Sequence, residues 1–117
     1  MKVQVLHIDE CPNTAVASSR VRAALDALRK TDVPVELVLV EMQTVAASTD
    51  FGGSPTILVD GQDLFPEATR VDTLACRVYW TTSGLAGVPT SAEIESALRS
   101  RDVRDVPSGG RKSEPSG

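Results

Sequence analysis

The chemistry that this chain can offer centres on two cysteines, Cys11 and Cys76. A thiolate is a strong nucleophile and a neutral thiol is not, so the pKa of each thiol decides what it can do. Cys11 lies just ahead of a stretch with a helical pattern, where the unpaired N–H groups of a first helical turn favour an anion. Asp9 and Glu10 act against a thiolate because they are themselves negative. The position ahead of the helix makes Cys11 the candidate catalytic nucleophile.

Two further residues are candidates to assist Cys11. Thr14, three residues on, is placed to donate a hydroxyl hydrogen bond to the sulfur. Cys76 is the candidate resolving thiol, because a fourth strand near 63–65 is expected to end at the same edge of the sheet as Cys11. The plainer alternatives stay open: Cys11 as a semi-buried loop cysteine and Cys76 as a surface cysteine, neither with a chemical role.

Composition and charge narrow the classes of function. The two cysteines and the one histidine, His7, lack the paired spacing of a metal site, so no metal and no cofactor are expected. A net charge of −4 argues against binding to nucleic acid or to an anionic membrane surface. No apolar run is long enough to span a bilayer, and residues 1–5 show a strand pattern without a signal-peptide core. A cytoplasmic protein with reduced thiols is expected.

Hydrophobic periodicity predicts one domain over residues 1–100, built from a β-α-β unit, a β-hairpin and further helices. Residues 101–117 are rich in Gly, Ser, Pro and charge and are expected to form a disordered tail. The hairpin is predicted to turn at Asp60-Gly61, and the last helix to be capped by Ser91. The predicted strands cover 2–8, 35–40, 56–59 and 63–65, and the predicted helices cover 13–30, 44–48, 71–79 and 91–100.

This order of elements resembles the thioredoxin fold, and two local features strengthen the resemblance. Cys11-Pro12-Asn13-Thr14 stands between the first strand and the first helix. Ser54-Pro55-Thr56 stands before the third strand, where thioredoxin-like proteins carry a cis-proline that faces the active cysteine. The resemblance implies an α/β fold with a four-stranded mixed sheet flanked by helices. It also implies a cis Ser54–Pro55 bond and a substrate-binding role for Ser54 and Pro55, with the Ser54 backbone presented to an extended substrate.

The chain is more narrowly similar to a small uncharacterised group of thioredoxin-like proteins, through the stretches 7–13, 53–61 and 76–79. Some members of that group are labelled as related to alkylmercury lyase. Beyond two thiols and nearby carboxylates, the catalytic pattern of the lyase is not matched here. The chain also departs from thioredoxins at Thr14, which replaces the second cysteine of Cys-x-x-Cys, so dithiol cycling on adjacent cysteines cannot occur.

The resemblance therefore implies a thiol-dependent oxidoreductase in which Cys11 attacks a disulfide, peroxide or other electrophile. Cys76 or a low-molecular-weight thiol would resolve the adduct, and the other partner would be a protein disulfide. Two alternatives stand beside this hypothesis. One is a non-catalytic module that binds a partner in the groove between Cys11 and Pro55. The other is soft-metal or organomercurial chemistry on the two thiolates.

Overall fold

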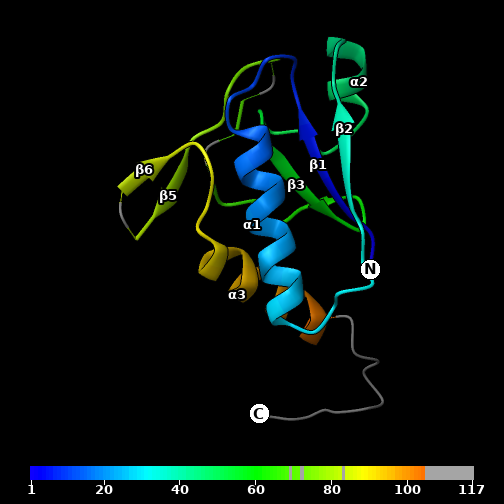
Figure 1. Ribbon diagram of the computed structural model, residues 1–117. Helices are drawn as coiled ribbons and strands as arrows, with labels where there is room; N and C mark the ends of the chain where they lie inside the picture. The colour runs from blue at the N-terminus through cyan, green and yellow to red at the C-terminus, as the bar shows by residue number, and fades with distance from the viewer. Residues whose placement is uncertain (69, 72, 83, 105–117) are drawn as a thin grey trace.

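A four-stranded mixed sheet forms the centre of the protein (Figure 1). The computed structural model describes residues 1–104 except 69, 72 and 83. The strand order is β2-β1-β3-β4, with β2 parallel to β1, and with β3 antiparallel to both β1 and β4. The predicted α/β class and the four-stranded mixed sheet are confirmed. The strands are β1 (Val3–His7), β2 (Val35–Leu39), β3 (Thr56–Val59) and β4 (Gln62–Asp63).

One face of the sheet is covered by the two long helices, α1 (Thr14–Ala27) and α3 (Ser91–Arg104). The buried residues of α1 recur at the spacing of one helix face. Val3 and Val5 of β1 and Ile57 of β3 meet this stripe from the sheet. The buried residues that the helices contribute are Ala17, Val21, Ala24, Leu25, Ile94 and Leu98.

The opposite face of the sheet carries a smaller core beneath the short helix α2 (Gln43–Ala47). Leu6 and Leu58 point into it from β1 and β3, and Phe51 and Ala46 close it. β1 therefore has buried side chains on both faces, which explains its apolar pattern on both sides of the strand.

The hairpin turn lies where the sequence predicts, whereas the cap of the last helix does not. Asp60 and Gly61 both have positive φ, as a two-residue hairpin turn requires. The predicted cap of the last helix is wrong, because Thr90 caps α3 and not Ser91. The Glu93 N–H donates to the Thr90 hydroxyl at 3.1 Å, and the Glu93 carboxylate accepts from the Thr90 N–H at 2.9 Å. This reciprocal pair places the cap one residue earlier.

The predicted helix over 71–79 is wrong. The described residues of this stretch form bends and an extended segment, which leads into strands β5 (Tyr79–Thr81) and β6 (Gly84–Ala86). Exposure alternates along 76–80: Cys76 is exposed, Arg77 buried, Val78 exposed, Tyr79 buried and Trp80 exposed. This period of two is typical of a strand, and the two-stranded hairpin projects beside α1 (Figure 1).

Several boundaries also differ from the prediction. α1 ends three residues before 30, because Arg29 adopts a positive φ and the Lys30 N–H returns to the Leu25 carbonyl at 2.8 Å. β4 stops at Asp63, whose carboxylate accepts the Phe65 N–H at 2.9 Å and diverts the backbone from the ladder. α3 continues to Arg104, four residues past its predicted end. The rest of the predicted tail, 105–117, lies outside the described residues.

Candidate functional site

Cys11 lies in the loop between β1 and α1, as predicted, and its side chain is partly exposed. Its carbonyl accepts the Thr14 N–H at 3.3 Å, and the Asn13 carbonyl accepts the Ala17 N–H at 2.9 Å. These bonds open the first turn of the helix directly after the cysteine. Gly87, which follows β6, packs against the same turn, since a Cβ atom there would lie 2.2 Å from Asn13 Nδ2.

The Ser54 hydroxyl affects the Cys11 thiol. Ser54 is fully buried, and its Oγ accepts the Ile8 N–H at 3.1 Å. Because Oγ already accepts that hydrogen bond, its own proton is left for another acceptor, and the Ser54 hydroxyl lowers the pKa of the Cys11 thiol. The pKa of Cys11 thus depends on a residue 43 positions away (54 − 11) that lies just before the third strand.

The surroundings of Cys11 favour its thiolate. Burial raises the pKa of the Cys11 thiol, but hydrogen bonds from Ser54, Asn13 and Thr14 outweigh burial and bring the pKa below its ordinary value. The Ser54 hydroxyl is the largest of these lowering effects. The Thr14 hydroxyl acts in the same direction but falls short of a full hydrogen bond, since its buried Oγ1 has no partner among the described residues.

The Ser54–Pro55 peptide bond is cis, as predicted. Both residues are buried, and the Ser54 backbone is already paired within the chain. The Ser54 N–H donates to the Ala75 carbonyl at 2.8 Å, and the Ser54 carbonyl accepts the Arg77 N–H at 2.8 Å. The expectation that this backbone is presented to an extended substrate is therefore wrong for the described structure.

The second cysteine pairs with the same residue, Ser54. Ser54 and Cys76 form a parallel β-bridge, so their backbones lie about one strand spacing, ~4.8 Å, apart. Paired residues of a ladder direct their side chains to the same side. Ser54 therefore acts on both cysteines: its hydroxyl lowers the pKa of the Cys11 thiol, and its backbone pairs with that of Cys76. Both thiols are free.

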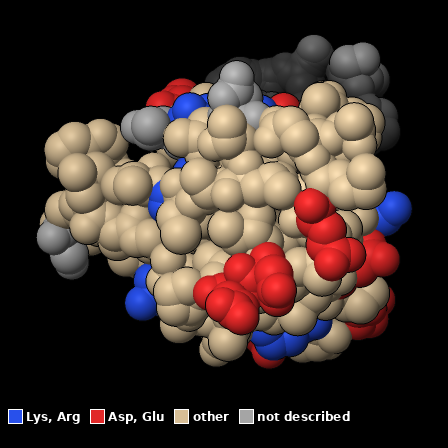
Figure 2. All heavy atoms as spheres, turned by 90° about the horizontal axis from the view of Figure 1, so that it is seen from above, with Lys and Arg blue, Asp and Glu red and all other residues tan. Residues whose placement is uncertain are grey.

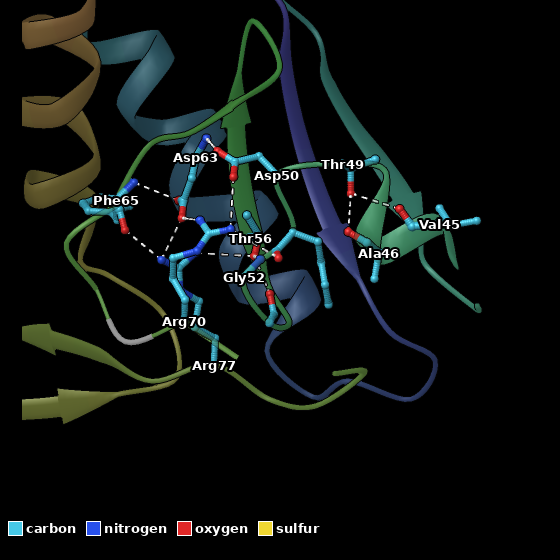
Figure 3. A network of polar contacts seen from close by, with 12 residues as sticks. Val45, Ala46, Thr49, Asp50, Gly52, Thr56, Asp63, Phe65, Arg70 and Arg77 are labelled. Carbon is cyan, nitrogen blue, oxygen red and sulfur yellow. Dashed lines mark hydrogen bonds and ion pairs between the residues drawn. The ribbon is translucent and has the colours of Figure 1, made fainter. Parts of the chain in front are cut away.

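A buried ion-pair network holds the segment that carries Cys76 (Figure 3). Arg77 is 1% exposed, and its Nη2 lies 2.8 Å from the carboxylate of Asp63, which is equally buried. Arg70 approaches the same carboxylate from a more exposed position and also pairs with Asp50 at 3.0 Å. Arg77 stacks over Tyr79, with 4.8 Å from the guanidinium carbon to the ring centroid. A role for Arg77 beside the Cys76 thiol, as its sequence position suggests, is wrong because the side chain points inward.

The sequence does not predict this ion-pair network, because charged side chains are expected to lie on the protein surface. Asp63 and Arg77 compensate each other across 14 residues (77 − 63), a distance that no local pattern reports. The alternation through Val78, Tyr79 and Trp80, residues that favour strands, was the available signal.

Figure 2 shows the molecule from above the view of Figure 1. Residues other than Lys, Arg, Asp and Glu make up most of this face, acidic side chains form several separate groups on it, and basic side chains lie mainly toward its margin. A cavity of about 480 Å³ beside Met1 and Pro34 and another of about 300 Å³ beside Trp80 and Pro89 do not include Cys11. Among the described residues of 1–104, which leave out 69, 72 and 83, no three His, Cys, Asp or Glu side chains gather as a metal site would need. No described helix has the length and apolar character to cross a bilayer.

Comparisons with known proteins leave the site to be judged on its own geometry. No family model matches the chain, and neither a curated protein nor a solved structure matches it.

Proposed function

We propose that this protein is a thiol-dependent oxidoreductase with a thioredoxin-like fold, in which Cys11 is the nucleophile and Cys76 the resolving thiol. The observation that carries the proposal is the place of Ser54, whose backbone forms a β-bridge with Cys76 and whose hydroxyl lowers the pKa of the Cys11 thiol. The sheet order, the cysteine between β1 and α1 and the cis-proline before β3 support the thioredoxin-like assignment.

The reaction consists of two thiol–disulfide exchanges. The Cys11 thiolate attacks one sulfur of a substrate disulfide, forms a mixed disulfide and releases the other sulfur as a thiolate. The Cys76 thiolate then attacks the Cys11 sulfur, closes an internal disulfide and releases the second substrate thiolate. The substrate gains two electrons and the cysteine pair loses two. Two equivalents of a low-molecular-weight thiol return the pair to its reduced form and become a disulfide themselves.

A non-catalytic binding module is the second candidate function. The outer face of the β5–β6 hairpin favours it, because Val78, Trp80 and Leu85 are 41%, 72% and 58% exposed. Large apolar side chains so exposed are typical of protein contact surfaces. In this case Cys11 would contribute no covalent chemistry, and the two candidates separate on its reactivity.

The test is a reaction of the reduced protein with oxidised glutathione, followed by mass spectrometry of the peptides. Wild type is expected to accumulate the Cys11–Cys76 disulfide and to release two glutathione thiols per chain. The Cys76→Ser variant is expected to stop at the Cys11–glutathione mixed disulfide, and Cys11→Ser to remain largely unmodified. Equal modification of the two single variants would contradict the proposal, as would wild type in which both thiols persist.

A further inference from the structure

The segment 75–79 is fastened to the proline loop by its side chains as well as by its backbone. Besides the two backbone bonds to Ser54, the Tyr79 hydroxyl donates to the Pro55 carbonyl, and Arg77 Nη1 lies 3.4 Å from Thr56 Oγ1. Cys76 lies between these attachment points. Its side chain is exposed, so its position depends on the backbone that carries it rather than on its own packing.

Arg77 anchors this backbone to the interior of the protein. Its guanidinium reaches the Asp63 carboxylate at 2.8 Å and the Phe65 carbonyl at 2.7 Å, and it stacks on Tyr79. Figure 3 shows Arg77 and Arg70 converging on Asp63 from different segments. A planar guanidinium can serve these partners together, whereas the point charge of a lysine cannot.

We propose that Arg77 is a positioning residue that holds Cys76 in reach of Cys11, so that the internal disulfide forms in preference to a lasting mixed disulfide. The inference rests on the proposed function, because it concerns the second exchange of that reaction. The contacts of Arg77 described above are with Asp63, Phe65, Thr56 and Tyr79. Arg77 acts by setting where the backbone of its neighbour lies, while the environment of Cys11 is set separately by Ser54 and the start of α1.

The experiment compares the effective concentration of the Cys11–Cys76 disulfide, measured against a glutathione redox buffer, in folded full-length variants. Arg77→Lys is expected to lower it about tenfold, because small misplacements of reacting groups cost large factors in an intramolecular step. Arg70→Lys is the matched control, since it makes the same change at the more exposed partner of Asp63, and it is expected to match wild type. The alkylation rate of Cys11 is expected to be unchanged in both variants.

A second variant serves if Arg77→Lys does not fold. Tyr79→Phe removes only the hydroxyl bond to Pro55 and keeps the ring against Phe65, so it is expected to fold and to lower the effective concentration about threefold. Folded Arg77→Lys or Tyr79→Phe with the wild-type value would overturn the inference. A parallel fall in the Cys11 alkylation rate would overturn it too, because it would show a general loss of structure. Wild type that forms no internal disulfide would instead contradict the proposed function itself.

Discussion

The two cysteines of this protein stand in regions that are built in different ways. Cys11 is surrounded by local structure, the first turn of α1, to which one distant residue, Ser54, is added. Cys76 belongs to an extended segment whose place is set by long-range contacts to the proline loop and to Asp63. The first region prepares a thiol chemically by lowering its pKa. The second region holds an exposed cysteine through the backbone that carries it.

The largest effect is expected from removal of the carboxylate under the Cys76 segment. Asp63→Ala leaves the buried Arg77 guanidinium without its main counter-charge, and we expect a loss of about 3–5 kcal/mol in the free energy of unfolding. Urea denaturation measures it. The control Glu95→Ala breaks the exposed pair with Arg99 and is expected to cost less than about 1 kcal/mol. Similar costs for the two changes would show that the network does not hold this region.

Gly53 tests how closely the proline loop packs against the segment that carries Cys76. Its φ is +115°, and an added Cβ would lie 2.7 Å from Val71 Cγ2 and 2.9 Å from Arg77 Cβ. Gly53→Ala is therefore expected to cost about 2–3 kcal/mol, from backbone strain and from overpacking. Gly61→Ala separates the two causes, since Gly61 also has positive φ but nothing within 4 Å of the added atom. A loss of about 1 kcal/mol is expected there, and an equal loss at both sites would argue against the close packing of the loop.

A smaller effect is expected on the Cys11 side. Ser54→Ala leaves the Ile8 N–H without its acceptor and should cost about 1–2 kcal/mol. It also removes the largest of the hydrogen-bond effects on the sulfur, so the pKa of Cys11 should rise and its alkylation at neutral pH should slow. Ser48→Ala, at an exposed serine, is the control for both measurements. Faster or unchanged alkylation in Ser54→Ala would show that the hydroxyl does not stabilise the thiolate.

The smallest effect is a pH dependence of stability carried by Cys11. Its pKa is lower in the folded than in the unfolded chain, so ionisation of the thiol favours folding. The contribution is complete above the pKa of a free thiol, about 8.5, and is lost as the pH falls through the lowered pKa of the folded state. The free energy of unfolding of wild type, minus that of Cys11→Ser, should therefore increase as the pH rises across this interval. A difference that shrinks with rising pH would mean that the folded state disfavours the thiolate.

The sequence predicts the Cys11 region better than the Cys76 region, because Cys11 is surrounded by local structure and the Cys76 segment is held by long-range contacts. The strand and helix that flank Cys11 carry apolar residues at regular spacing, and the Asp60-Gly61 turn is a local signal. The position of Cys11 and the cis bond at Pro55 were both predicted, the latter through the family resemblance.

The segment that carries Cys76 is predicted as a helix because its apolar residues recur at helical spacing, at Val71, Leu74, Ala75 and Val78. The side chains that it buries are instead Arg77 and Tyr79. Arg77 is buried only because Asp63 compensates its charge, and that pairing exists only once the sheet has formed. The pairing of Ser54 with Cys76 is likewise a contact between segments, which no periodicity within one of them can report. The sequence therefore offers Cys76 as a candidate partner of Cys11 but does not predict the extended segment that carries it.

The most direct test of the central claim is the rate of Cys11 alkylation as a function of pH in the Cys76→Ser variant, which leaves a single thiol. The surroundings of Cys11 predict a titration midpoint below that of an unperturbed cysteine, and a midpoint that moves up when Ser54→Ala is added. A midpoint at or above about 8.5, unaffected by Ser54→Ala, would contradict the assignment of Cys11 as an activated nucleophile.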